Sequence, residues 1–196
     1  MTVAAPLTTF RLERGVSIAQ ARPPNSDAVT WDSPALEVMT DLTEVRAATT
    51  HPATSLRQAE QMMIYQGVRM LFVVTEMPRL DGLITSTDLH GERQMGVVHS
   101  RQLRFDEMRV ADVMTELSML DAIEFERMGG VTVSNLVTTL KDVSRNHLLV
   151  VQKSEGAGPP RVRGVISRAQ IERQLGRPIE VAEVAVNFAE VVRALR

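Results

Sequence analysis

The order of apolar and polar positions along the chain occurs twice. The seven residues that begin at Leu36, Leu-Glu-Val-Met-Thr-Asp-Leu, return at Ala111 as Ala-Asp-Val-Met-Thr-Glu-Leu. Each copy is followed, in the same order, by a short strand, a helix with one apolar face, an apolar strand, and a strand that begins with glycine and enters a helix. A repeat of this kind defines the unit of structure before any single residue is interpreted. The pattern predicts one fold unit, present twice, between two terminal segments.

The clearest helix of the first copy begins after Ser55. Ser55 and Gln58 have the spacing of a capping box, in which each side chain satisfies a free backbone N–H of the other residue. Apolar residues then recur at helical spacing on one face: Leu56, Ala59, Met62 and Met63. The pattern predicts a helix of about three turns.

Short apolar runs predict the strands. The run 70–74 is too short for a core helix and is interpreted as a strand covered on both faces. A polar turn over 76–81 places the strand 82–85 at hairpin distance from it. The first copy also predicts a short helix through Met39, a short strand over 45–48, and a helix from Thr85 toward Met95.

The second copy predicts the same elements in the same order. They are a strand near 120–125, a helix from Ser134, strands over 148–151 and 161–166, and a helix that opens at Ser167. Its hairpin loop, 155–160, is longer than that of the first copy, as is tolerated at an exposed tip.

The two ends lie outside the repeat. Residues 1–32 show no sustained periodicity and are expected to form an arm. Charged residues at intervals of three and four predict an amphipathic C-terminal helix, which either packs on its own chain or contacts a second copy. The predicted division is an arm over 1–32, motifs over 33–97 and 109–176 joined by a linker over 98–108, and the helix over 177–196.

Composition narrows the classes of function. The 196 residues include 22 basic and 24 acidic residues, one Trp and one Tyr, which is unlike the basic and aromatic surface of a nucleic-acid binder. Cysteine is absent, which excludes disulfides and thiolate chemistry. No uncharged apolar stretch approaches the ~20 residues that span a bilayer. We expect a cytoplasmic protein whose partners are neither nucleic acids nor membranes.

The sequence shows no pattern of a catalytic or metal site. The four histidines, at positions 51, 90, 99 and 147, lack a metal-ligand spacing such as His-Glu-x-x-His. Neither a P-loop nor a Gly-x-Ser-x-Gly motif occurs. We expect no enzymatic activity and no metal ion.

Met-Thr, strand, helix, apolar strand and Gly-apolar-apolar-Thr/Ser-x-x-Asp, in two tandem copies, resemble the paired cystathionine-β-synthase domains, also called a CBS pair or Bateman module. The resemblance covers roughly 33–176. It implies an α/β (α+β) fold of two β-α-β-β-α motifs that pack by their sheets around a pseudo-twofold axis. It also implies clefts for an adenine nucleotide or adenosyl compound, such as AMP, ADP, ATP or S-adenosylmethionine, and association into a homodimer.

The junction at Thr85 suits a nucleoside phosphate. A free helix N-terminus and the Thr85 hydroxyl would meet phosphate, and a carboxylate one turn later, Asp88, can accept both hydroxyls of a ribose; these are also the roles that the resemblance implies. Arg69 would neutralise phosphate charge, and adenine would enter an apolar slot near Val45 and Ile84. Alternatively, Thr85 and Asp88 form an N-cap pair without a ligand, and Arg69 is a surface arginine.

The second copy departs from the pattern at the carboxylate. Ser167 preserves the hydroxyl, but Gln170 replaces Asp, so the ribose contact is lost or weakened. Arg168 and His147 would draw phosphate to this cleft, although a lone His beside a strand is more often structural. We therefore expect an asymmetric module with one competent cleft.

Two functions remain open at this point. One is a sensor that binds an adenine compound and signals to an effector protein on another polypeptide, which requires different affinities for two arrangements of the chain. The other is a structural or oligomerisation module with degenerate clefts. Thr85 and Asp88 favour the sensor, whereas Gln170 and the amphipathic C-terminal segment favour the alternative.

Overall fold

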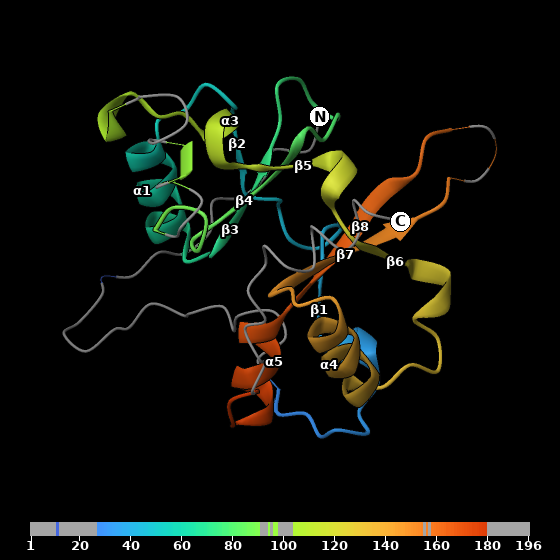
Figure 1. Ribbon diagram of the computed structural model, residues 1–196. Helices are drawn as coiled ribbons and strands as arrows, with labels where there is room; N and C mark the ends of the chain where they lie inside the picture. The colour runs from blue at the N-terminus through green and yellow to red at the C-terminus, as the bar shows by residue number, and fades with distance from the viewer. Residues whose placement is uncertain are drawn as a thin grey trace.

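The computed structural model describes residues 27–90, 104–154 and 158–179, together with residues 11, 94, 96, 97 and 156. It shows two four-stranded sheets with helices on their outer sides (Figure 1). Most of the predicted N-terminal arm and linker, and nearly all of the predicted C-terminal helix, lie outside the described residues.

The first sheet has the order β2-β3-β4-β5. Its strands are β2 (Thr49–Thr50), β3 (Met70–Val73), β4 (Gly82–Thr85) and β5 (Thr115–Glu116). Strands β2 and β3 are parallel, and the other neighbours are antiparallel. Helix α1 (Leu56–Gln66) connects β2 to β3, and α3 (Val110–Val113) precedes β5.

The second sheet has the corresponding order β6-β7-β8-β1. Its strands are β6 (Ala122–Glu124), β7 (His147–Gln152), β8 (Arg161–Ser167) and β1 (Met39–Asp41). Helix α4 (Val133–Asp142) connects β6 to β7, and α5 (Arg168–Leu175) follows β8. Four short 3-10 turns also occur among the described residues: η1 (Ala35–Val38), η2 (Phe105–Glu107), η3 (Leu117–Met119) and η4 (Phe125–Arg127).

The two repeats exchange their first strands. β1, from the first repeat, pairs with β8 of the second, and β5, from the second repeat, pairs with β4 of the first. The matching segments before these strands are anchored in the same way: the Ala35 N–H donates to the Val131 carbonyl, and the Val110 N–H donates to the Thr54 carbonyl, both at 2.8 Å. We call each sheet with its helices a unit, the first unit being that of the first sheet. Each unit therefore contains one strand from the other repeat.

Glycine at the start of β4 makes the exchange sterically feasible. A Cβ on Gly82 would lie 2.3 Å from the carbonyl oxygen of Thr115 in β5. At the matching position in β8, a Cβ on Gly164 would lie 2.6 Å from the sulfur of Met39 in β1. The glycine in each copy of the repeat thus leaves room for the strand donated by the other copy.

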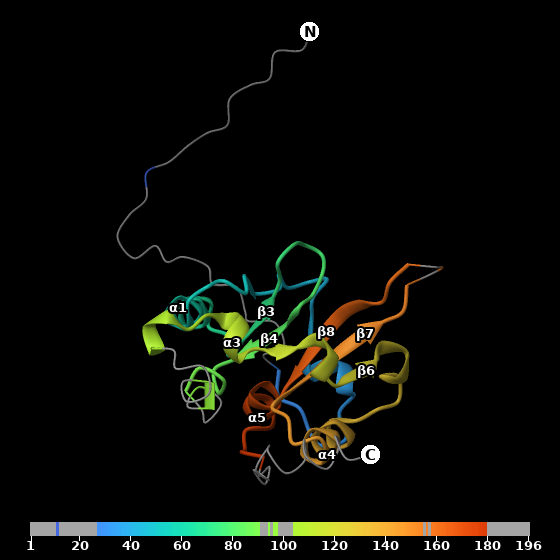
Figure 2. The same ribbon diagram turned by 45° about the horizontal axis from the view of Figure 1, so that its top comes forward.

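The core has three parts. One lies between the first sheet and α1, and another lies between the second sheet, α4 and α5. The third joins the sheets to each other through Met70, Phe72, Leu83, Leu149 and Val165. Helices α1 and α4 thus lie on opposite outer sides of the paired sheets (Figure 2). The predicted packing of two similar units by their sheets is confirmed.

Most predicted elements occur within a residue or two of their expected bounds, with two differences. The capping box of α1 is present, with the Gln58 N–H donating to the Ser55 hydroxyl at 3.3 Å. The short strand predicted over 45–48 is wrong: residues 42–45 form a turn because the Asp41 carboxylate accepts from the Thr43 N–H at 2.8 Å, and the strand comes at Thr49–Thr50. A helix was predicted from Thr85 toward Met95. Residues 86–90 form turns instead, residues 94, 96 and 97 are helical, and residues 91–93 and 95 lie outside the described part of the chain.

Candidate functional site

Thr85 and Asp88 form a compact hydrogen-bonded pair at the end of β4. The Thr85 N–H and hydroxyl donate to the same carboxylate oxygen of Asp88, at 2.8 and 2.7 Å. The Asp88 N–H lies 3.4 Å from the Thr85 hydroxyl oxygen, which completes a capping arrangement. Both residues are half-buried. A ribose diol at this point would have to share the carboxylate with Thr85.

Arg69 lies next to the Thr85–Asp88 pair in the first unit. It precedes β3, and its carbonyl accepts from the N–H of Ser86, the residue after Thr85, at 2.9 Å. The first residue of β3, Met70, pairs with Thr85 and packs between the two sheets. The exposed Arg69 side chain therefore starts beside the junction with the second unit.

The matching positions of the second unit carry different residues. His147, the first residue of β7, pairs with Ser167 and thus occupies the position that Met70 has in the first unit. The Arg168 N–H donates to the Asn146 carbonyl at 2.9 Å, as Ser86 does to Arg69. The Arg168 side chain forms an ion pair with Glu172, with 3.6 Å between Nε and Oε1.

Charged groups from both units affect the pKa of His147. The pKa of His147 is lowered from 6.5 to about 4. Burial is the main cause, and the positive charges of Arg69 and Arg168 add to it. Like charges disfavour a charged imidazole, so both guanidinium groups favour the neutral form of His147. One arginine from each repeat thus acts electrostatically on His147.

Gln170 has a structural role on α5. It is buried, its amide N–H donates to the Gln174 side-chain oxygen at 2.9 Å, and its own oxygen accepts from Arg173. Gln174 in turn donates to the carbonyls of Asp27 and Glu37, at 3.0 and 3.1 Å. The side chain that replaces Asp therefore takes part in attaching the chain near residue 27 to the second unit. Ser167, the N-cap of α5, makes no capping hydrogen bond with its hydroxyl.

Two predicted residues lie apart from this cluster. Ile84 is fully buried in the core between the first sheet and α1, so its side chain is enclosed by protein and does not reach the surface. Val45 is half-buried in the turn after β1, where its N–H donates to the Asp41 carbonyl at 2.9 Å.

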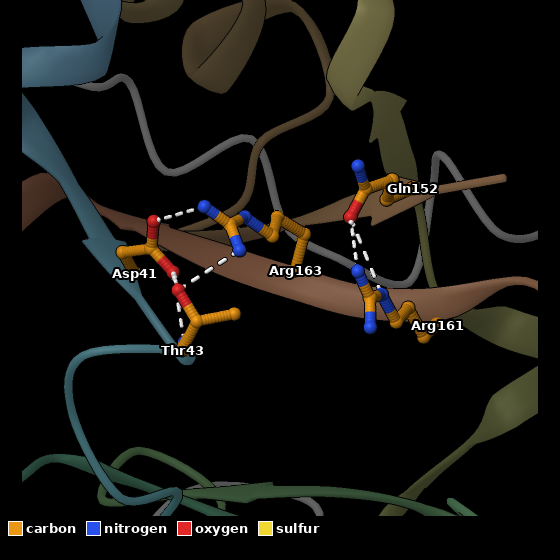
Figure 3. Close-up of polar contacts among 5 residues, drawn as sticks. All are labelled: Asp41, Thr43, Gln152, Arg161 and Arg163. Atoms are coloured by element: carbon orange, nitrogen blue, oxygen red, sulfur yellow. Dashed lines mark hydrogen bonds and ion pairs between the residues drawn. The ribbon is translucent and has the colours of Figure 1, made fainter. Parts of the chain in front are cut away.

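A polar network that the sequence did not predict holds β1 on β8 (Figure 3). Arg163 donates to the Asp41 carboxylate at 2.7 Å and to the Thr43 hydroxyl at 2.8 Å, and its guanidinium lies 5.3 Å from the centre of the Phe125 ring.

The same contacts lower the pKa of Asp41. Burial alone would raise this pKa, but the hydrogen bonds from Thr43 and the positive charge of Arg163 together outweigh the effect of burial. Arg161 donates to Gln152 across the neighbouring strands.

Other kinds of site receive no support from the described part of the chain. Among residues 27–90, 104–154 and 158–179, no group of three or more His, Asp or Glu side chains is arranged to hold a metal ion. No described helix is long and apolar enough to cross a membrane. A hollow of about 590 Å³ on the outer face of α1 is lined by Thr54, Gln58, Gln61, Met62, Tyr65 and Gln66, and so includes none of the predicted site residues.

Comparison with known proteins identifies the repeated unit. Residues 35–93, which extend from η1 past Asp88, match the sequence model of the CBS domain. The chain contains a CBS domain. Its two units have the fold of a tandem CBS pair, and the matched residues contain the β1 strand that is donated to the second sheet. No curated protein matches the sequence at a significant level.

Solved structures share this fold at low sequence identity. An uncharacterised conserved protein from Pyrococcus horikoshii is 18% identical with a TM-score of 0.52, over 79% of this chain and 100% of that one. A CBS-domain containing protein from Agrobacterium tumefaciens is 16% identical with a TM-score of 0.50, over 70% and 93% of the two chains. A Methanocaldococcus jannaschii protein, suggested to be an archaeal homolog of g-AMPK, is 16% identical with a TM-score of 0.51, over 72% of this chain and 49% of that one.

Proposed function

We propose that this CBS pair is a non-catalytic regulatory module of the cytoplasm that binds an adenine nucleotide or adenosyl compound where its two units meet. The observation that carries the proposal is that His147, whose pKa burial lowers to about 4, also feels the positive charges of Arg69 and Arg168, one from each repeat. Guanidinium groups are suited to phosphate because they donate charged, paired hydrogen bonds. A ligand held by both arginines would respond to the relative position of the units.

The residues around this point suit the parts of a nucleotide. Arg69, Arg168 and the Ser167 hydroxyl would contact phosphate. At pH 7 His147 is neutral, so it would contribute a hydrogen bond rather than a charge. Asp88 would accept from the ribose in exchange for part of its bond to Thr85. Val45 is the remaining candidate for an apolar contact with adenine.

We expect one ribose-binding cleft in each chain. In the first unit the carboxylate of Asp88 is half-buried beside β4. In the second unit Gln170 is turned into a buried network with Gln174, and an amide supplies one acceptor where a carboxylate supplies two. Two equal nucleotide sites per chain would contradict this asymmetry.

A second candidate function, self-association without a ligand, is favoured by the outer face of α1. Ile64 and Tyr65 on that face are 73% and 93% exposed. The matching face of α4 is polar, with Ser134, Asn135, Thr138 and Lys141 exposed. Large apolar side chains in water are typical of contact surfaces. We therefore propose a homodimer that uses α1, with the effector protein still to be identified.

The test is calorimetric titration of the chain with AMP, ADP, ATP and S-adenosylmethionine, compared with Asp88→Ala. The matched control is Asp112→Ala, because the Asp112 carboxylate accepts from the Arg109 N–H at 2.8 Å, much as Asp88 accepts from Thr85. We expect binding of at least one compound to be lost in Asp88→Ala and kept in Asp112→Ala. Absence of binding by all four compounds, in a dimer that dissociates on Tyr65→Glu substitution, would favour the self-association function instead.

A further inference from the structure

The turn after α5 contacts the N-terminal part of the described chain. The guanidinium of Arg177 lies 4.6 Å from the centre of the Trp31 ring, close enough for a cation–π interaction. Ile179 and Val29 are buried in the same hydrophobic core. The Trp31 carbonyl in turn accepts from the Ser134 N–H, at the start of α4. The conformation of residues 176–179 therefore influences how the segment around Trp31 is attached.

Glu172 connects this turn to the proposed ligand site. Its Oε1 atom accepts from the Ile179 N–H at 3.0 Å and lies 3.6 Å from Nε of Arg168. One carboxylate oxygen thus contacts both the arginine at the start of α5 and the backbone beyond its end. The Glu172 and Arg168 side chains are 26% and 29% exposed, so the pair is partly shielded from solvent.

A phosphate group would compete with Glu172 for Arg168. Both are anions that bind a guanidinium through the same N–H groups, and a doubly charged phosphate binds more strongly than a carboxylate. If Arg168 turned to such a ligand, Glu172 would lose the positive charge that fixes its position. Its hydrogen bond to Ile179 would then weaken or rearrange, and the Arg177 contact with Trp31 would change with it.

We propose that the Arg168–Glu172 ion pair is a ligand-responsive switch, through which a phosphate-bearing ligand at the junction of the units alters the attachment of the Trp31 segment to the second unit. This inference rests on the function proposed above and specifies how binding is signalled. The signal leaves the binding site along α5 and reaches the segment that continues into residues 1–26. An effector contacted by that part of the chain would detect occupancy.

The chain carries its own reporter, because Trp31 is its single tryptophan. The full chain is titrated with AMP, ADP and ATP while Trp31 emission and its quenching by acrylamide are followed, and binding is measured separately by calorimetry. We expect a saturable change in Trp31 emission with the same dissociation constant as the calorimetric signal. Binding without any change at Trp31 would overturn this inference and leave the proposed function intact, whereas no calorimetric binding would overturn both.

Glu172→Gln isolates the switch. The amide oxygen can still accept from Ile179, but it no longer pairs with Arg168. This variant should bind the nucleotide up to about five-fold more tightly, the equivalent of a ~1 kcal/mol ion pair, because no pair has to be broken. It should also lose the Trp31 response. A Glu172→Gln variant that binds normally and keeps the full response would refute the switch.

The matched control is Glu124→Gln in the same unit. Glu124 also accepts from an arginine, Arg127, at 2.9 Å, and pairs with Lys153 at 3.1 Å. None of its partners belongs to the proposed site. The control should keep both binding and the Trp31 response, and an equal loss in the control would mean that the effect is not specific to the Arg168–Glu172 pair.

Discussion

Replacing Gly82 by alanine tests the strand exchange directly. The new Cβ would lie 2.3 Å from the Thr115 carbonyl oxygen and within 3.3 Å of the Glu116 Cα, which are backbone atoms of β5. The oxygen contact is about 1 Å shorter than an ordinary van der Waals contact, so β5 has to move. Because β5 joins its sheet through only two residue pairs, a shift of this size weakens the whole attachment.

The expected cost follows from overpacking and hydrogen bonding. Forcing an extra carbon into a packed site costs about 1–3 kcal/mol, and each weakened hydrogen bond adds up to ~1 kcal/mol. The lower chain entropy of unfolded alanine offsets about 0.4–1 kcal/mol. We expect Gly82→Ala to lose about 2–3 kcal/mol of unfolding free energy, or roughly 4–12 °C in Tm for a chain of this size.

Gly164→Ala is the matched comparison. Its Cβ would meet the sulfur of Met39 at 2.6 Å and the Thr40 carbonyl oxygen at 3.0 Å. A flexible thioether can rotate away, and the backbone contact is only slightly short, unlike the 2.3 Å contact at Gly82. We expect a loss of about 1 kcal/mol or less. Met39→Ala should reduce that loss in the double variant but leave the effect of Gly82→Ala unchanged. Thermal and urea unfolding, followed by circular dichroism, give all values, and an equal or larger loss for Gly164→Ala would refute the steric reasoning.

The remaining predictions concern pH. The pKa of His147 falls from about 6.5 in the unfolded chain to about 4 in the folded protein, so the unfolded state binds more protons between these values and stability should decrease as pH falls from 6.5 to 4. Urea unfolding of His147→Asn should lack up to about 3 kcal/mol of this decrease, and an unchanged pH profile would contradict the burial of a neutral imidazole. The Asp41 carboxylate, whose pKa is lowered, affects stability at lower pH than His147 does. Its contribution to stability is full above the unfolded pKa of 3.8 and is lost as pH falls through the folded pKa. Asp41→Asn should therefore reduce stability at pH 7 and flatten the curve below pH 4, whereas a parallel shift of the whole curve would exclude a titrating role for this carboxylate.

Local patterns predicted the helices, the long strands and the two hairpins, but not the pairing of short strands between the repeats. The capping box at Ser55 and Gln58 needs only four consecutive residues, so α1 was predictable. Strands β2 and β5 have two residues each, too few to show a period, and their partners depend on the other repeat. A single sequence does not indicate that Asp41 meets Arg163, because 122 residues separate them.

The sequence predicted which residue types could form the candidate site, but not how their side chains are arranged. The repeat pointed to Thr85 and Asp88, whose mutual hydrogen bonds match the capping alternative, and the ligand role remains a proposal. The apolar run at Ile84 did not show which face of the sheet each residue occupies, and that face is the core. The burial of Gln170 depends on Gln174 and on the distant segment near Asp27, which no local motif signals.

The donation of β1 to β8 also determines the order in which the protein can be completed during synthesis. Asp41 leaves the ribosome 122 residues before Arg163, and at about 5–20 residues per second its strand waits roughly 6–24 s for a partner. During this interval the first sheet also lacks β5 until Glu116 emerges. Neither sheet can therefore be finished early and independently of the other half. A truncated product that contains only the first repeat would expose the apolar residues of β1 and the open edge of β4, and would be recognised as unfolded.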